Sequence, residues 1–307
     1  MGISKLIEYC KEFGVSLTGI TAFSRFLRML HLLYIVPTYD KYKYKIIENW
    51  LEKEYGDIIS SFEAKANQCK ISKDDPIYIF WWQGEKAMPS VVKACYRSII
   101  QNAGEHVVEL ITEDNVKNFV QIPQGIYDGV KEGKISITHL SDVIRNGLLY
   151  QRGGIWMDAT IYMTAPLPEI MYEYEYYTLK GAFEDWKWTT FFQASGRGTV
   201  LPGIVSCVFD EYIKEHTLFL TYLLQDCIIQ LCYDKRPDVR CLIDKLPRSD
   251  KKIFQMNDKY LDEPYTEDLF TQIRKGSCMH KLSYKYHHEI IKDGKMTVWG
   301  KLLREGE

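Results

Sequence analysis

Residues 141–160 read SDVIRNGLLYQRGGIWMDAT, and this stretch decides the fold. The first half has the apolar spacing of a helix over residues 142–151. Gly153-Gly154 then supplies the open backbone that a sharp chain reversal requires. Ile155-Trp156-Met157 follows as a short apolar strand that ends on Asp158. The stretch therefore predicts a helix, a glycine turn and a strand that delivers a carboxylate at its end.

The predicted helix has two different faces. Ser141 is its expected N-cap. Its polar face carries Asp142 and Arg145, three residues apart, and this face ends beside the turn that delivers Asp158. An ordinary surface ion pair would explain Asp142 and Arg145 equally well. The apolar face carries Val143, Ile144, Gly147 and Leu148.

A strand–helix–strand unit precedes this stretch. Its parts are an apolar strand at 77–82, a helix at 90–101 and a second strand at 106–111. A connection of this length makes the two strands parallel, so the fold class is α/β. Ligands of such sheets lie outside the carboxyl ends of the strands, which places Trp82 and Gln83 at a candidate site. Alternation along a strand sends one of Trp81 and Trp82 into the core.

The first 72 residues form a separate helical segment, and residues 73–307 form the main domain. Arg25, Arg28 and His31 make one stripe in an otherwise apolar stretch, and lysines alternate with tyrosines over 39–45. A helix lying in a membrane interface fits this pattern, and so does a helix packed on the main domain. Residues 17–45 are therefore a candidate peripheral membrane contact.

Composition excludes several classes of protein. The chain has 307 residues with 39 Lys plus Arg against 41 Asp plus Glu, so it offers no general attraction for nucleic acid. An apolar fraction of 46% excludes a disordered chain. The eight cysteines lack zinc-ribbon spacing, and we expect reduced thiols in the cytoplasm.

Asp158 is the main candidate for metal chemistry. Mg²⁺ and Mn²⁺ prefer oxygen ligands, take few protein carboxylates and complete their shells with water and substrate phosphates. A carboxylate at a strand end behind two glycines suits that role. Capping of the next turn is the alternative for an aspartate at this position.

The motifs resemble those of a known family. Residues 141–160 are similar to the sugar-binding region of glycosyltransferase family 32, and most closely to its capsular polysaccharide synthesis protein branch. Phe80-Trp81-Trp82-Gln83-Gly84 with Pro89 resembles the opening motif, and residues 279–285, MHKLSYK, resemble the closing motif. Three separated motifs occur in order over roughly residues 75–290.

The resemblance implies a GT-A fold, a nucleotide-sugar-binding α/β sandwich, which here carries an N-terminal helical extension. It also implies a UDP-sugar donor and a divalent cation, usually Mn²⁺. By position, Trp82 would stack on the donor base, Asp142 and Arg145 would hold the ribose and donor sugar, and Trp156 would lie near the nucleotide. Asp158 would bind metal and diphosphate, His280 would be a second metal ligand, and Lys281 or Lys285 would meet the diphosphate.

One position departs from the motif. The family's motif has a second acidic residue at the position that is Thr160 here. The change removes one negative charge from the metal shell, so metal binding would depend more on donor phosphates. Asp185, Trp186, Trp188 and Gln193 fall where the family contacts sugars, although a solvated loop or core packing explains each equally well.

The resulting hypothesis is a retaining hexosyltransferase in capsular or cell-surface polysaccharide synthesis. It would move galactose or glucose from a UDP-sugar to a lipid-linked oligosaccharide, in the cytoplasm or on the inner face of the cell membrane. The alternative is a catalytically weak carbohydrate-binding or scaffold protein that keeps the fold, which the missing second acid favours. No pair of carboxylates suited to glycoside hydrolysis is identifiable.

Overall fold

A computed structural model describes residues 3–32, 34–64, 69–183, 186–249 and 251–306. The chain divides into two compact units, each of which is described by itself. The helical unit comprises residues 1–65, 121–147 and 200–241. The sheet unit comprises residues 66–120, 148–199 and 242–307. The predicted domain boundary near residue 72 stays a prediction. The helical unit contains residues 121–147 and 200–241 in addition to the N-terminal segment.

The sheet unit is built on one five-stranded mixed sheet in the order β2-β1-β3-β6-β5. β1 pairs in parallel with β2 and with β3, whereas β6 is antiparallel to both β3 and β5. The expected parallel strand–helix–strand unit and the α/β class are thereby confirmed. The strands are β1 (Ile77–Phe80), β2 (Val108–Ile111), β3 (Gly154–Asp158), β5 (Tyr176–Thr178) and β6 (Phe192–Ser195).

The glycine pair before β3 has the predicted open backbone. Gly153 has a φ of 76° and Gly154 a φ of 115°. A Cβ on Gly154 would lie 2.6 Å from Tyr78 Cε2 and 2.8 Å from the Pro76 carbonyl oxygen. Only glycine fits this position, because both the conformation and the space exclude a side chain.

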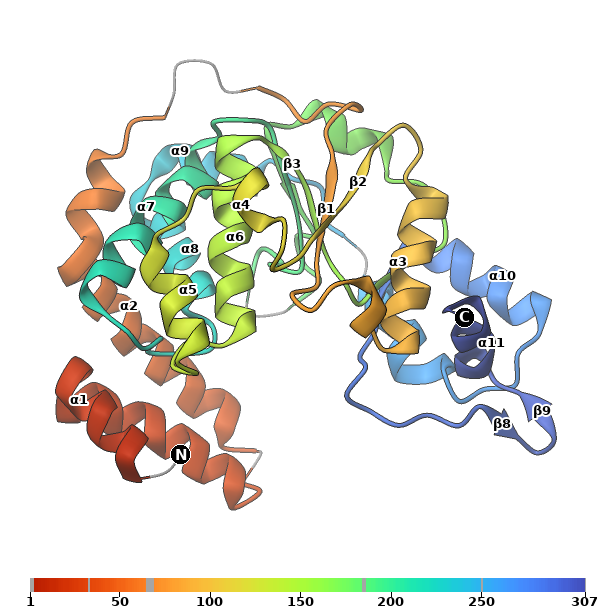
Figure 1. The fold of residues 1–307 in the computed structure, drawn as a ribbon, viewed down its shortest axis with the longest axis horizontal. Helices are drawn as coiled ribbons and strands as arrows, with labels where there is room; N and C mark the ends of the chain where they lie inside the picture. The colour runs from red at the N-terminus through yellow and green to blue at the C-terminus, as the bar shows by residue number, and fades with distance from the viewer. Residues whose placement is uncertain (1–2, 33, 65–68, 184–185, 250, 307) are drawn as a thin grey trace. The chain divides into compact units, whose positions relative to one another are not determined.

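Two further strand pairs and several helices complete the sheet unit. α3 packs against α11 (Figure 1) and also against β4. The strand pairs are β4 (Ile161–Met163) with β7 (Met279–Lys281), and β8 (Ile291–Lys292) with β9 (Lys295–Met296). The helices are α3 (Ser90–Asn102), α4 (Val116–Phe119), α10 (Glu267–Gly276) and α11 (Val298–Gly306), with short turns η1 (Glu85–Ala87), η2 (Glu169–Glu173), η3 (Lys251–Phe254) and η4 (Met256–Tyr260).

The helical unit is centred on α2, which packs against α1, α7 and α8. Ile47, Leu51, Tyr55 and Ile59 recur every four residues and are buried, so α2 presents one apolar face to the core. α1 bends at Gly14, whose φ of 77° is not helical. The helices are α1 (Ile3–Met29), α2 (Val36–Ser61), α5 (Gln124–Lys131), α7 (Val200–Glu215), α8 (Leu224–Lys235), and the beginnings of α6 (Ile137–Gln151) and α9 (Pro237–Asp244).

Several local predictions were wrong. α6 begins at Ile137, because Ser136 Oγ accepts a hydrogen bond from the His139 backbone N–H. Ser141 therefore lies inside the helix and donates to the Thr138 carbonyl oxygen over 2.6 Å. His31 lies beyond the end of α1 with a φ of 54°, so the basic stripe on this helix is limited to Arg25 and Arg28.

The N-terminal helices are confirmed, and α1 is packed along α2 through buried residues such as Leu17 and Leu27. Within the described ranges, no helix combines the length and the apolar character needed to cross a bilayer.

Candidate active site

Asp158 lies at the carboxyl end of β3, level with Phe80 at the end of β1. Two neighbours hold its carboxylate. Trp156 Nε1 donates a hydrogen bond to Oδ1 over 3.1 Å, and Lys281 Nζ donates to Oδ2 over 2.8 Å. The Asp158 side chain remains 31% exposed. The carboxylate is thus oriented by the chain and still open to a ligand.

Lys281 contacts both Asp158 and Thr160. It reaches this place from β7, where it pairs with Ile161 of β4. Its Nζ also donates to Thr160 Oγ1 over 2.6 Å and lies 5.2 Å from the centre of the Phe191 ring. The lysine therefore joins both ends of the Asp158-Ala159-Thr160 segment. The pair is half-buried, with 22% of the Lys281 side chain and 31% of the Asp158 side chain exposed.

His280 occupies a different environment from its neighbour Lys281. Successive residues of a strand point to opposite faces, and His280 Nε2 lies 3.3 Å from Thr164 Oγ1. The ring is 2% exposed, and burial lowers its pKa to about 4. The structure brings Lys281, rather than His280, to Asp158. Among the described residues, no three His, Cys, Asp or Glu side chains gather to form a metal site.

The tryptophans near the strand ends divide into two kinds. Trp156 is buried against Phe80, with ring centroids 6.2 Å apart and planes 26° apart. Trp81 and Trp82 both follow the last residue of β1 and are half-buried, so the expectation that one would lie in the core was wrong. The strand ends before them, and strict alternation no longer applies. Trp82 and the exposed Gln83 do lie at the carboxyl end of β1, as predicted.

The remaining sheet-unit candidates are placed as follows. Lys285 is exposed beyond β7, where its backbone N–H donates to Ser283 Oγ. Trp188 is 1% exposed and Gln193 is 2% exposed, with Gln193 Nε2 bonded to Tyr176 Oη, so both are core residues. Trp186 is half-buried beside Trp188. Asp185 lies outside the described residues.

Asp142 and Arg145 form a buried ion pair in the helical unit. Arg145 Nη1 donates to Asp142 Oδ1 over 2.7 Å and to Gln225 Oε1 of α8 over 2.5 Å. Both residues are less than 10% exposed, so the polar face of α6 is as covered as its apolar face. Removing one member of such a pair would leave a buried charge and destabilise the fold by about 3–5 kcal/mol. Their contact with a sugar donor stays a prediction.

Sequence reasoning missed the part that Trp156 plays in orienting Asp158. The two residues are two positions apart in one strand and therefore share a face, which was the available signal. The contact of Lys281 with Asp158 bridges 123 positions of sequence. It depends on the pairing of β7 with β4, which local patterns do not reveal.

Comparison with known proteins places the chain in a family. No curated protein matches it. One solved structure, the apo form of the bifunctional glycosyltransferase WbbM, is similar with a TM-score of 0.40 and 9% sequence identity. The match covers 80% of this chain and spans only 50% of that one. Residues 33–302 match the family model for capsular polysaccharide synthesis protein. The chain therefore belongs to the capsular polysaccharide synthesis protein family.

Proposed function

We propose that this chain is a retaining glycosyltransferase of the GT-A type. It moves a hexose, galactose or glucose, from a UDP-sugar to a lipid-linked oligosaccharide on the cytoplasmic face of the membrane. Membership of the capsular polysaccharide synthesis protein family supports the role in polysaccharide synthesis. The observation that carries the proposal is the convergence of Lys281 on Asp158 and Thr160 at the end of β3.

The chemical task explains this convergence. When the bond from the anomeric carbon to the UDP oxygen breaks, negative charge grows on the departing diphosphate. An ammonium already held at the site stabilises that charge more in the transition state than in the bound donor. Asp158 and Thr160 hold the Lys281 ammonium at 2.8 and 2.6 Å, which restricts its motion. The half-buried Trp82 at the end of β1 offers a ring for the donor base.

A divalent cation, Mn²⁺ or Mg²⁺, would have to share Asp158 and Thr160 with the Lys281 ammonium, which already contacts both side chains. One carboxylate and one hydroxyl from the chain leave the other positions to donor phosphate oxygens and water, an arrangement that these ions accept. The bound cation would neutralise the leaving diphosphate. His280 is left out of this ligand set, because its Nε2 lies 3.3 Å from Thr164 Oγ1 and its strand neighbour Lys281 is the residue that reaches Asp158.

For retention of configuration we propose same-face attack, in which the acceptor hydroxyl approaches from the side that the diphosphate leaves. In this step the new bond joins the acceptor oxygen to the anomeric carbon, and a departing phosphate oxygen takes the hydroxyl proton. The chain then needs no protein nucleophile. Lys281 stays beside the diphosphate while Asp158 holds the lysine in place.

Release of UDP from UDP-galactose and UDP-glucose, with Mn²⁺ and a lipid-linked acceptor, tests the proposal. We expect Asp158→Asn and Lys281→Met to lower transfer by about 10²-fold or more, as for other electrostatic groups in transition-state stabilisation. Lys295→Met, at an exposed lysine of β9, is the matched control and should retain activity. Full activity of Asp158→Asn would contradict the proposal. Binding of a UDP-sugar without turnover of any donor would favour the scaffold alternative.

A further inference from the structure

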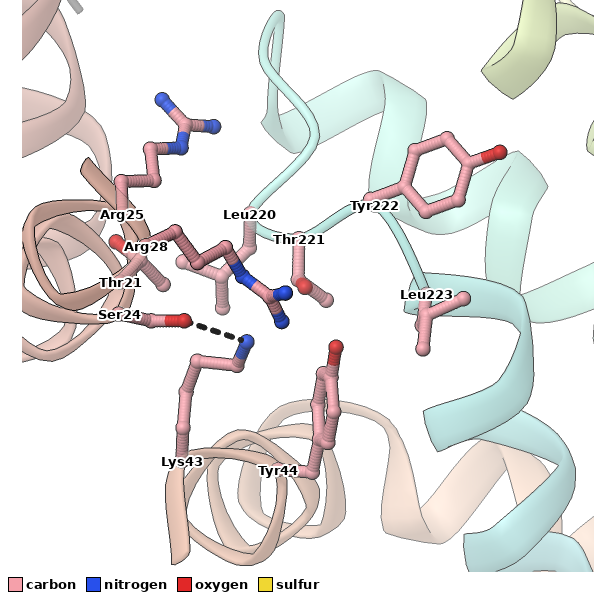
Figure 2. Close-up of a pocket in the computed structure, with 10 residues that line it drawn as sticks. All are labelled: Thr21, Ser24, Arg25, Arg28, Lys43, Tyr44, Leu220, Thr221, Tyr222 and Leu223. Atoms are coloured by element: carbon pink, nitrogen blue, oxygen red, sulfur yellow. Dashed lines mark hydrogen bonds between the residues drawn. The ribbon is translucent and has the colours of Figure 1, made fainter. Parts of the chain in front are cut away.

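A polar pocket lies wholly within the helical unit. Its volume is about 400 Å³. Three parts of the chain line it: α1, α2 and the segment 220–223 that precedes α8 (Figure 2). The residues used below are Thr21, Ser24, Arg25 and Arg28 from α1, with Lys43 and Tyr44 from α2.

The lining of this pocket is cationic. Arg25, Arg28 and Lys43 contribute three positive charges, and no carboxylate is among the lining residues. Two carboxylates act on this region from outside the lining, Asp40 and Asp226. The lining itself therefore offers an anion only cationic and neutral groups, with the Arg28 guanidinium and the Lys43 ammonium facing each other.

Asp40 holds two of these cations in place. It pairs with Arg28 and accepts hydrogen bonds from Lys43 Nζ over 2.7 Å and from Ser24 Oγ over 2.6 Å. Burial alone would raise the pKa of the Asp40 carboxyl, but the bonds from Lys43 and Ser24 outweigh burial and lower it. Burial lowers the pKa of Lys43, whose side chain is only 7% exposed. The cations are therefore positioned before any ligand arrives.

The donors of the pocket also suit phosphate oxygens. Figure 2 shows the Arg28 guanidinium, the Lys43 ammonium and the Tyr44 hydroxyl directed toward one another from two helices, whereas Arg25 and Tyr222 point outward. Arginine binds phosphate through paired N–H groups, and lysine acts as a compact charge. Hydroxyls of the lining, including Thr221, add further donors.

An exposed apolar face accompanies the pocket on the same helix. Phe23, Phe26 and Met29 at the end of α1, with Leu30 just after it, are between 46% and 68% exposed, beside Arg25 and Arg28 in sequence. Free phosphate or a nucleotide would gain nothing from such a face. An amphiphile with an anionic head would use both features, because the pocket takes the head and the apolar face meets its hydrocarbon or the bilayer.

We infer that this pocket binds the phosphate or diphosphate head of the lipid that carries the acceptor. The inference rests on the proposed function, which requires a lipid-linked acceptor. Residues of α1 and α2 would then bind the acceptor lipid. Bulk anionic lipid and free phosphate offer the same phosphate chemistry. The experiment below therefore distinguishes them from the lipid that carries the acceptor.

The direct test is calorimetric titration of the whole chain with decyl diphosphate, a soluble single-chain probe, and with inorganic pyrophosphate. We expect decyl diphosphate to bind more tightly than pyrophosphate. Loss of a charge-assisted bond in Arg28→Gln should weaken decyl diphosphate binding about tenfold. Lys53→Gln removes an exposed cation of α2 outside the pocket and should bind as the wild type does. Tyr44→Phe, which removes a hydroxyl directed toward Arg28 and Lys43, is a second variant if Arg28→Gln fails to fold.

Three results would overturn the inference. They are the absence of decyl diphosphate binding, equal affinity for pyrophosphate and decyl diphosphate, and affinity unaffected by Arg28→Gln and Tyr44→Phe. Phosphatidylcholine vesicles with and without phosphatidylglycerol give the bulk-lipid comparison. Binding to vesicles that needs phosphatidylglycerol, but tolerates both substitutions, would identify a membrane contact in place of this site.

Kinetics separate this inference from the proposed function. Arg28→Gln should raise the KM for a lipid-linked acceptor several-fold and leave the KM for the UDP-sugar unchanged. A parallel rise in both values would count against an acceptor site. If the wild type releases no UDP from any donor, the proposed function fails, whereas calorimetry still reports whether the pocket takes an amphiphilic diphosphate.

Discussion

The indole nitrogen of Trp156 donates a hydrogen bond to Asp158 Oδ1 over 3.1 Å, from a ring that is 1% exposed. The two residues share one face of β3, and packing of the ring on Phe80 prevents it from turning away. The carboxylate is therefore aimed by the same strand that carries it. Lys281 then completes the arrangement from a distant part of the sequence.

Trp156→Phe should keep the ring packing and remove the hydrogen bond to Asp158. Because a bond to a charged group contributes about 1.5–3 kcal/mol, we expect kcat/KM for the UDP-sugar to fall at least tenfold. Steady-state UDP release measures this effect. Trp299→Phe on α11 is the control and should leave kcat/KM unaltered. Wild-type kinetics in Trp156→Phe would show that the indole does not orient Asp158 for catalysis.

Removal of divalent cations tests the proposed metal. A chelator should abolish transfer, and Mn²⁺ should restore it. A UDP-sugar should raise the unfolding temperature more with Mn²⁺ than without, since a ligand of the folded state alone adds to stability. Asp158→Asn should lose the additional rise in unfolding temperature that depends on Mn²⁺. His280→Gln should keep it, given the contact of His280 with Thr164. Equal loss in both variants would instead make His280 a ligand.

Gly154→Ala should destabilise the chain by several kcal/mol. The new Cβ would clash with Tyr78 and the Pro76 carbonyl, at a φ of 115° that is unfavourable for any side chain. Gly104→Ala is a matched control, because Gly104 has a φ of 64° with nothing within 4 Å of an added Cβ. It should cost only about 1 kcal/mol. Denaturant unfolding of both variants measures the difference, and equal losses would refute the clash.

His139 should make the chain sensitive to acid. Its ring stacks on Phe219 with centroids 4.2 Å apart, and burial lowers its pKa to about 4 from an ordinary value near 6.5. A group whose folded pKa is lowered contributes stability above the unfolded pKa. That contribution declines as the pH falls from about 6.5 toward about 4, by about 2 kcal/mol in total after allowance for partial exposure.

The corresponding variant is His139→Phe, which keeps an aromatic ring and cannot be protonated. Its free energy of unfolding should fall less between pH 7 and pH 4 than that of the wild type. His287→Phe, at an exposed position, should follow the wild-type profile. Identical profiles for His139→Phe and the wild type would exclude His139 as a source of the acid sensitivity.

Local sequence patterns were sufficient for the parts of the fold that depend on near neighbours. Apolar runs with Gly153-Gly154 between them predicted β3 and its terminal carboxylate, because a positive φ and a strand end are local properties. The parallel pairing of β1 and β2 followed from the length of the helix between them. Family motifs also marked Lys281, although they left Lys285 as an equal choice.

The tertiary structure decided which side chains meet. It paired β7 with β4 and thereby turned Lys281 toward Asp158 and His280 toward Thr164, a consequence of strand register. It covered Asp142 and Arg145 with α8, where helical spacing alone had left them on an open face. It also gathered the cations of α1 and α2 around Asp40. Local backbone preference was enough to predict β1, β2, β3 and the carboxylate at the end of β3 from the sequence. The partners of each side chain depend on contacts between distant segments, which only the folded chain specifies.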